Sequence, residues 1–299
     1  MRAMANLDDL LIKTSRTFAL SIPMLPEPTR RHVGIAYLLF RVADTFEDAA
    51  RWPRAKRLAA LDDLARLLTT PGDETLAAAR WLADVPVSHA GYLELLRETP
   101  AVMDAYWAVP ATARAVLRRD LLRTVSGMAG FVRRGDARGN LRLGSLRELR
   151  DYCYVVAGIV GEMLTELFLL DAEVLASFAS HLRRRSRFFG EALQLVNILK
   201  DVGSDATEGR VYLPEGVDRA RIFLLARRDL DVAAAYVSTL QLSGAPEGFV
   251  AFTGSPAVLA RASLDRIEST TEGNKLTRVE VGALMERMFE NLAARRPLL

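Results

Sequence analysis

The sequence predicts an all-α fold. Apolar residues recur at helical spacing over long stretches, such as Leu7–Leu20 and Leu58–Leu68. Prolines divide the first third of the chain into short segments, and none occurs between Pro110 and Pro214, where we expect the longest helices. No stretch alternates apolar and polar residues as a strand does, and no internal repeat is present. We therefore expect one compact helical domain over residues 1–299.

The composition argues against several classes of protein and site. A net charge of +3 is too small to predict a nucleic-acid partner, and a single cysteine, Cys153, excludes an internal disulfide or a cysteine-based zinc site. No run reaches the roughly 20 uninterrupted apolar residues of a membrane-spanning helix. Asp8 and Asp9 argue against a signal peptide, so we expect a cytoplasmic protein. The basic run Arg183–Arg187 is either a solvated helix face or a contact with anionic lipid.

The first expected helix covers Leu7–Leu20 and ends before the prolines at 23, 26 and 28. Ser15 and Arg16 lie near its end, where a hydroxyl and a guanidinium could bind a phosphate. Ordinary capping and surface charge are the alternative explanation.

The next expected helix, from Glu27 to Asp48, carries an acidic face. Its polar residues follow helical spacing and form one stripe: Tyr37, Arg41, Asp44 and Asp48, with Glu47 beside them. Carboxylates this close repel one another, and oxygen donors with no His or Cys nearby favour magnesium. A solvated acidic helix end is the alternative.

Shorter helices follow, and the chain then becomes almost entirely apolar or small from Tyr152 to Leu170. Ala157, Gly158 and Gly161 lie within this stretch, although each glycine costs a helix about 1 kcal/mol. Another segment or a ligand must therefore approach this backbone closely. Close helix packing and the wall of an apolar channel are both consistent with the pattern.

A second acidic face is expected at Gln194–Asp205, where Asn197, Asp201 and Asp205 follow one another at steps of four residues, provided that the helix continues through Gly203. Two such faces could hold magnesium between them and neutralise a departing diphosphate. The loop after them carries Arg210, which could bind that diphosphate, and the rest of the chain is helical by pattern.

Five segments resemble the head-to-head prenyl synthases, the family of squalene, dehydrosqualene and phytoene synthases. They occur in the family's order: Ser15–Phe18, Asp44–Asp48, Tyr152–Gly161, Asn197–Asp201 and Gly209–Pro214. The Asp-Thr-x-Glu-Asp form of the first acidic box most resembles squalene synthase, since phytoene synthases more often have Asp-Asp-x-x-Asp. The resemblance implies a helical bundle of the isoprenoid synthase type with a central active-site cavity.

The resemblance also implies an activity, which is the magnesium-dependent condensation of two farnesyl diphosphates through presqualene diphosphate to squalene, with NADPH as reductant. It assigns metal binding to Asp44, Glu47, Asp48, Asn197, Asp201 and Asp205. It assigns the diphosphates to Ser15, Arg16, Arg41, Gln194, Lys200 and Arg210. Tyr37 and Tyr152 are the candidates for steering the proton, with Arg41 as a further catalytic candidate.

The sequence departs from the family at Lys200, where arginine is usual, and at Ser204, where an acid is frequent. The chain contains no dinucleotide fingerprint, so NADPH binding depends on the resemblance of the C-terminal segments that contain Phe252, Lys275 and Arg278. The resemblance assigns the cofactor to Lys275, Arg278 and Asn197, and the apolar channel to Phe252 with Ala157, Gly158 and Gly161.

Two alternatives remain open at this point. A dehydrosqualene or phytoene synthase would share every metal residue and differ only in the final quench or the substrate length. A non-catalytic helical assembly factor would keep the fold, but such proteins lose the acidic boxes that are intact here. A peripheral membrane contact for product release is also considered, and the sequence indicates no oligomeric state.

Overall fold

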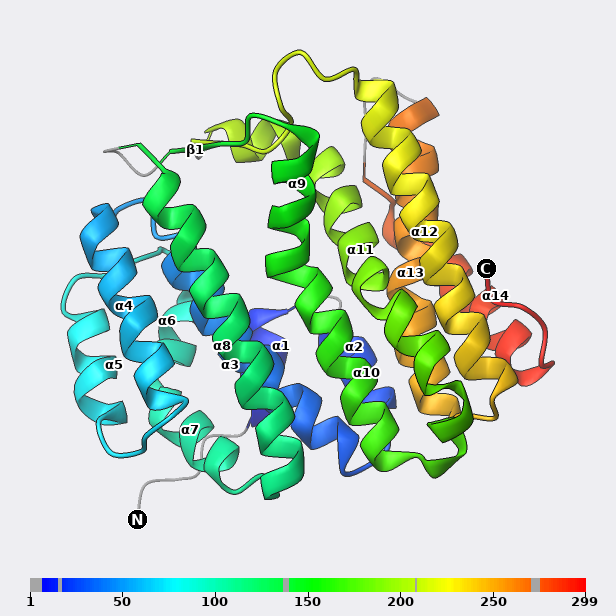
Figure 1. The fold of residues 1–299 in the computed structure, drawn as a ribbon, viewed down its shortest axis with the longest axis horizontal. Helices are drawn as coiled ribbons and strands as arrows, with labels where there is room; N and C mark the ends of the chain where they lie inside the picture. The colour runs from blue at the N-terminus through cyan, green and yellow to red at the C-terminus, as the bar shows by residue number, and fades with distance from the viewer. Residues whose placement is uncertain (1–6, 16–17, 137–139, 208, 270–274) are drawn as a thin grey trace. The chain divides into compact units, whose positions relative to one another are not determined.

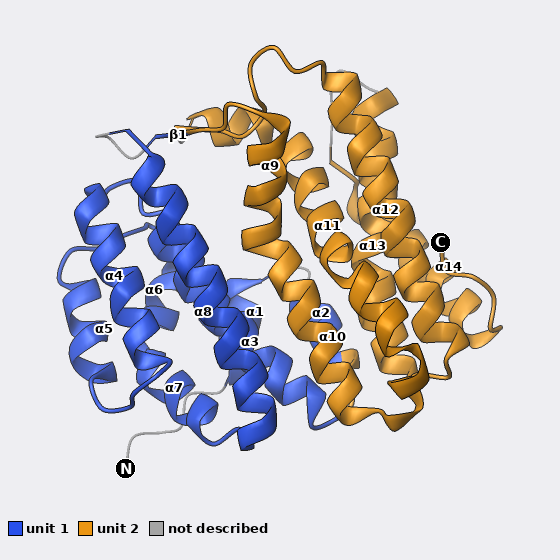
Figure 2. Cartoon of the chain, viewed as in Figure 1, with its two compact units in different colours: residues 1–23, 27–141 blue, residues 24–26, 142–299 orange. Residues whose placement is uncertain are grey.

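The computed structural model describes residues 7–15, 18–136, 140–207, 209–269 and 275–299. The described chain is almost entirely helical, which confirms the all-α prediction (Figure 1). It divides into two compact units (Figure 2): residues 1–23 with 27–141, and residues 24–26 with 142–299. The expectation of a single domain stays a prediction.

Unit 1 is built around the helix that carries the first acidic face. Its helices are α1 (Leu7–Thr14), α2 (Phe18–Ser21), α3 (Thr29–Glu47), α4 (Arg54–Leu67), α5 (Glu74–Leu82), α6 (Ala90–Arg97), α7 (Thr99–Trp107) and α8 (Ala111–Arg134), and the short turn η1 (Ile22–Met24) leaves the unit. α3 packs against α1, α4, α6, α7 and α8. Phe46 fixes its C-terminal end, because its ring contacts Trp81 at 4.7 Å and Trp52 at 5.9 Å between centroids.

The first expected helix is interrupted. α1 ends at Thr14, whose hydroxyl donates to the Leu10 carbonyl, and α2 begins at Phe18. The Ser15 hydroxyl accepts a hydrogen bond from the backbone N–H of Phe18, the first residue of α2, at 2.9 Å. Apolar spacing alone does not reveal such a break, because the apolar pattern continues across it.

Unit 2 contains the second acidic face. Its elements are α9 (Leu146–Cys153), the π-helical segment η2 (Tyr154–Gly158), α10 (Ile159–Asp171), η3 (Glu173–Phe178), α11 (Ala179–Thr207), α12 (Arg219–Leu242), α13 (Glu247–Ser269) and α14 (Arg278–Ala293). α11 packs against α9, η2, α10, α12 and α13. β1 (Leu141–Arg142) and β2 (Arg210–Val211) form a two-stranded sheet among the described residues.

The longest helix, α11 with 29 residues, lies in the proline-free region as predicted. α8 also lies there with 24 residues, but α12 has the same length and begins after Pro214. α13 continues through Pro256. The absence of proline therefore predicted α8 and α11, but it did not predict the long helices α12 and α13 that follow Pro214.

One described stretch, Leu146–Asp171, is long and apolar enough by length and composition to cross a membrane. Half of its most apolar window is buried within the protein. The criterion of an uninterrupted apolar run did not detect it, because Glu162 and Glu166 interrupt the run. On its own the stretch is weak evidence for a membrane span.

Candidate functional site

The predicted stripe on α3 is the solvent-facing edge of an otherwise buried helix end. Between Tyr37 and Asp48, the partly or fully exposed residues are Tyr37, Arg41, Asp44 and Asp48. Glu47, predicted beside the stripe, is only 6 % exposed. Helical spacing therefore placed the four stripe residues on one face, with Glu47 on its buried side.

Arg41 connects the members of this stripe. Its Nη1 lies 3.3 Å from Asp44 Oδ2, and its Nη2 donates to the Tyr37 hydroxyl at 3.3 Å. The Tyr37 hydroxyl in turn donates to the Thr14 carbonyl at 3.0 Å, which ties the stripe to the end of α1. The guanidinium also lies over the ring of Tyr92 on α6, 5.3 Å from its centroid. These contacts hold a cation at the acidic face.

On this face, Arg41 lacks one hydrogen-bond partner and Asp44 lacks full compensation of its charge. Arg41 Nε is buried and has no hydrogen-bond partner within the described residues. Burial raises the pKa of the Asp44 carboxyl to about 6, against the lowering effect of Arg41 and with a further raising effect from Asp48. A diphosphate oxygen could accept from Arg41 Nε, and a bound cation would stabilise the ionised form of Asp44.

The second acidic face lies on α11, which continues through Gly203 to Thr207 as its spacing required. Lys200 Nζ donates to Asn197 Oδ1 at 2.9 Å and lies 3.4 Å from Asp201 Oδ2. Arg210 Nη2 lies 3.8 Å from Asp205 Oδ1. Gln194 is half-buried just before this group in sequence, and no role of its side chain is evident. The face therefore combines oxygen donors with cations that could bind diphosphate oxygens.

Tyr152, the tyrosine predicted to act in catalysis, lies on α9 in the same unit. It is 4 % exposed, and its hydroxyl lies 2.9 Å from the hydroxyl of Tyr212, the residue that follows β2. The rings are stacked with centroids 4.6 Å apart. The sequence placed Tyr212 in a family segment but assigned it no role.

The glycines of the apolar stretch are explained by close helix packing. A Cβ atom at Gly161 would overlap the Ser186 carbonyl of α11, and one at Gly190 would overlap the Ala157 carbonyl. A Cβ at Gly158 would crowd the Tyr154 ring and Glu191 Cγ. The predicted close approach to this backbone is confirmed. The role of these residues in a channel stays a prediction, as does that of Phe252, which is 2 % exposed in α13.

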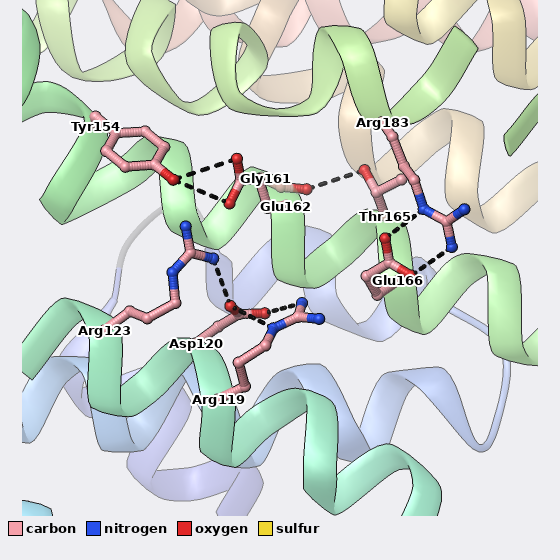
Figure 3. Close-up of polar contacts among 9 residues, drawn as sticks. All are labelled: Arg119, Asp120, Arg123, Tyr154, Gly161, Glu162, Thr165, Glu166 and Arg183. Atoms are coloured by element: carbon pink, nitrogen blue, oxygen red, sulfur yellow. Dashed lines mark hydrogen bonds and ion pairs between the residues drawn. The ribbon is translucent and has the colours of Figure 1, made fainter. Parts of the chain in front are cut away.

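Polar groups accompany this apolar helix. The Tyr154 hydroxyl donates to Glu162 Oε2 at 3.2 Å, and Arg183 forms two hydrogen bonds to Glu166, of 2.6 and 2.7 Å (Figure 3). The Thr165 hydroxyl donates to the Gly161 carbonyl at 3.0 Å. The ion pair formed by Arg183 explains one member of the basic run Arg183–Arg187 without a lipid.

A model of the squalene/phytoene synthase family matches residues 11–221. The chain belongs to this family. It is 28 % identical over 202 residues to the squalene synthase of Mycosarcoma maydis, which is 68 % of this chain and 34 % of that protein. It is also 28 % identical over 208 residues to the squalene synthase of Schizosaccharomyces pombe, which is 70 % of this chain and 43 % of that protein. The chain thus matches less than half the length of these curated relatives.

A phytoene synthase of Thermus thermophilus is 35 % identical over 136 residues, 40 % of this chain and 44 % of that protein. Among solved structures, a ligand complex of TcSQS gives a TM-score of 0.74 at 24 % identity, and the match covers 97 % of this chain and 88 % of that one. This likeness confirms the all-α fold of a squalene/phytoene synthase.

The family's other predicted residues are only partly placed by the structure. Ser15 is half-buried and its hydroxyl accepts a hydrogen bond from the Phe18 backbone N–H, while Arg16 lies outside the described residues. Lys275 Nζ lies 3.7 Å from Asp201 Oδ1, and its side chain is 77 % exposed. Arg278 is the exposed first residue of α14. Thr277 caps that helix together with Glu280.

The predicted metal ligands form two groups, Asp44, Glu47 and Asp48 on or just after α3, and Asn197, Asp201 and Asp205 on α11. Among the described residues, no three His, Cys, Asp or Glu side chains come together as a metal site. The donors are carboxylate and amide oxygens, the ligands that magnesium prefers. Their chemistry therefore fits the metal that the family resemblance implies.

Sequence reasoning missed two polar clusters that surround buried carboxylates. On α8, Asp120 is fully buried and accepts hydrogen bonds from Arg119 and Arg123 (Figure 3). On α11, Glu191 is fully buried and pairs with Arg187 at 2.9 Å and with Arg150 at 3.4 Å. In both helices the sequence signal that could have indicated the cluster is an acid and an arginine spaced three or four residues apart.

Proposed function

We propose that the protein is a magnesium-dependent prenyltransferase that joins two farnesyl diphosphates head to head, through presqualene diphosphate, and reduces the product to squalene with NADPH. The observation that carries this proposal is the pairing of each acidic face with a cation: Arg41 beside Asp44, and Lys200 beside Asp201. A site that binds both magnesium and diphosphate needs oxygen donors and cations side by side.

The proposed metal ligands are Asp44, Glu47, Asp48, Asn197, Asp201 and Asp205. When bound, magnesium would neutralise the diphosphate and favour its departure as a leaving group. Of these residues, Asp48 and Asn197 are exposed and Asp44, Asp201 and Asp205 are partly exposed, so their oxygens are accessible to a metal. Glu47 is the buried exception and the weakest of the six candidates.

The chain's own cations would hold the diphosphate. Arg41 is the strongest candidate, because its buried Nε lacks a hydrogen-bond partner among the described residues and its rigid guanidinium suits a phosphate. Lys200 and Arg210 lie within 4 Å of Asp201 and Asp205 respectively. Ser15, Arg16 and Gln194 complete the proposed set.

Tyr37 and Tyr152 would orient the proton that is lost when the cyclopropane ring closes. The hydroxyl of each is held by a partner, the Thr14 carbonyl for Tyr37 and the Tyr212 hydroxyl for Tyr152. Buried apolar residues, among them Gly158, Gly161 and Phe252 with the half-buried Ala157, would keep water from the reactive carbocations. NADPH, when bound near Lys275, Arg278 and Asn197, would supply the reduction.

A second candidate is a dehydrosqualene or phytoene synthase, in which the reduction is absent. The identity of 35 % to a phytoene synthase over 136 residues supports this alternative. The non-catalytic alternative is disfavoured, because both acidic boxes are present. We also propose a cytoplasmic protein with peripheral membrane contact, because a released isoprenoid hydrocarbon partitions into lipid.

The deciding experiment is to incubate the protein with farnesyl diphosphate and magnesium, with and without NADPH, and to identify the products. Squalene in the presence of NADPH supports the first candidate. Dehydrosqualene as the main product under both conditions supports the second. No turnover of farnesyl diphosphate would contradict both a squalene and a dehydrosqualene synthase.

A further inference from the structure

Tyr212 and Tyr152 form a close pair inside unit 2. Their hydroxyl oxygens lie 2.9 Å apart, and their rings are stacked at 4.6 Å with an angle of 28° between the planes. Tyr152 is 4 % exposed and Tyr212 is 7 % exposed. Two buried hydroxyls at this distance share a hydrogen bond, and stacking restricts rotation of either ring.

The segment that carries Tyr212 also borders the second acidic face. Arg210 Nη2 approaches Asp205 Oδ1 at 3.8 Å, and the Val211 carbonyl accepts from the Leu143 backbone N–H at 3.0 Å. Asp205, Arg210 and Tyr212 line one small cavity with Ile198 and Leu213. Tyr212 therefore shares a cavity with Asp205 of that face and a hydroxyl contact with Tyr152.

A tyrosine hydroxyl rotates about its C–O bond and has one hydrogen to donate. In a buried site its direction is set by the strongest neighbouring acceptor or donor, because an unmatched buried hydroxyl is unfavourable. The Tyr212 hydroxyl thus influences where the Tyr152 hydroxyl points. Because Tyr212 belongs to the same segment as Arg210, a change at the diphosphate-binding segment would reach Tyr152 through this contact.

We propose that Tyr212 is a positioning residue for the condensation, and that its hydroxyl orients the hydroxyl of Tyr152 and couples it to the segment that carries Arg210. This inference rests on the proposed function. The competing explanation is structural: the pair would only fasten this segment to α9. The two explanations differ in what a change of one hydroxyl does to turnover.

The test uses four variants of the full chain: Tyr212→Phe, Tyr152→Phe, the double variant, and Tyr236→Phe. Phenylalanine removes the hydroxyl and keeps the stacked ring. Tyr236 is the matched control, because it is 1 % exposed in α12 and its hydroxyl lies 2.8 Å from Thr165 Oγ1. Each variant is assayed for kcat and KM with farnesyl diphosphate and magnesium, and for its thermal midpoint.

We expect Tyr212→Phe to lower kcat about 10- to 100-fold with KM within about twofold, as misorientation of a catalytic group does. Its thermal midpoint should change no more than that of Tyr236→Phe, whose kcat should stay close to that of the unmodified protein. The double variant should be no slower than Tyr152→Phe, because Tyr212 acts through Tyr152.

Three results would overturn the inference. These are an unchanged kcat in Tyr212→Phe, a loss of kcat no larger than that of Tyr236→Phe, and losses that multiply in the double variant. An Asp201→Asn variant separates this failure from failure of the proposed function. If Asp201→Asn abolishes turnover while Tyr212→Phe does not alter it, only the positioning role fails. If the unmodified protein does not turn over farnesyl diphosphate, the proposed function fails and the inference fails with it.

Discussion

Arg41 shows at the scale of one residue how the acidic face of α3 is kept charged in a folded protein. Its guanidinium lies beside Asp44 and over two tyrosine rings. Burial of Asp44 opposes its ionisation, and Arg41 opposes that effect. An acid that is only partly exposed and only partly compensated is a feature that folding alone does not favour, and it supports the cation site proposed above.

The first prediction concerns the two acidic faces. Asp44→Asn and Asp201→Asn should each lower kcat/KM for farnesyl diphosphate by about two to four orders of magnitude, because each removes a charge that is proposed to hold magnesium. Circular dichroism should show an unchanged helical content. Asp62→Asn is the control, since Asp62 is exposed on α4 and belongs to neither face. Turnover by either variant at the level of Asp62→Asn would contradict the metal assignment.

Helical spacing was sufficient to predict the stripe on α3 and the face on α11, because both depend only on positions within one helix. Tyr212 could not be assigned in this way. Its partner lies 60 residues earlier in the chain, so the contact depends on the path of the backbone. Arg41 Nε is a similar case, because its lack of a partner is visible only after its neighbours are placed.

At the scale of elements, the approach of α10 to α11 depends on glycine. Gly161 faces the Ser186 carbonyl, and Gly190 faces the Ala157 carbonyl, with no room for a Cβ at either position. The sequence indicated this approach through the cost of glycine in a helix. It did not indicate the π-helical turn of η2, since one extra residue per turn leaves no signal in apolar spacing.

The second prediction tests this approach. Gly161→Ala should lower the free energy of unfolding by about 1–3 kcal/mol, because the added methyl group displaces the backbone of α11. Gly282→Ala is the matched control: Gly282 is exposed within α14 and has no atom within 4 Å of an added Cβ. That control should gain up to about 1 kcal/mol from helix propensity alone. Denaturant unfolding measures both, and equal effects in the two variants would contradict the packing argument.

At the scale of the whole molecule, a buried acid of unit 2 should contribute to the pH dependence of stability, in addition to Asp44, whose pKa is also raised to about 6. Asp229 on α12 is 2 % exposed, and its Oδ2 has no hydrogen-bond partner among the described residues. Burial raises the pKa of Asp229 to about 6, from an ordinary value of 3.8. The charged and titratable groups around it are Arg150, Cys153, Arg187, Glu191 and Arg228.

The sign follows from proton binding. Between pH 3.8 and about 6, the folded protein keeps a proton on Asp229 that the unfolded chain has released. The free energy of unfolding therefore falls as pH rises through this range, and the penalty is fully present above it. The third prediction is that Asp229→Asn removes a decline on the order of 1–3 kcal/mol.

Urea unfolding at a series of pH values from 4 to 7 measures this decline. Asp231→Asn is the control, because Asp231 lies on the same helix with a side chain that is 71 % exposed. We expect the control to keep the decline of the unmodified protein. A curve for Asp229→Asn that coincides with the control over this range would contradict a protonated Asp229 in the folded state.

The fold class and the order of the family segments could be predicted from the whole sequence, because helical periodicity and motif order are properties of the chain itself. The product could not be predicted as securely. Squalene and dehydrosqualene synthases share the residues of both acidic faces and differ in the final reduction, which depends on groups outside those faces. Lys275 is the residue of this chain on which that difference can be tested.

The fourth prediction is that Lys275→Ala slows the reductive step and spares the first condensation. Lys275 lies 3.7 Å from Asp201 but is 77 % exposed, so the ion pair contributes little to the fold and its loss should leave the thermal midpoint unchanged. The exposed ammonium group of Lys275 can bind the phosphates of NADPH, and such a contact does not require a Rossmann loop. Presqualene diphosphate formed without NADPH should therefore match that of the unmodified protein, while squalene formed with NADPH should fall about tenfold or more.

Lys13→Ala, which removes an ion-paired lysine from α1, is the control. Equal loss of both half-reactions in Lys275→Ala would instead place Lys275 at the diphosphate beside Asp201. If the unmodified protein forms dehydrosqualene at saturating NADPH, the protein belongs to the non-reductive branch.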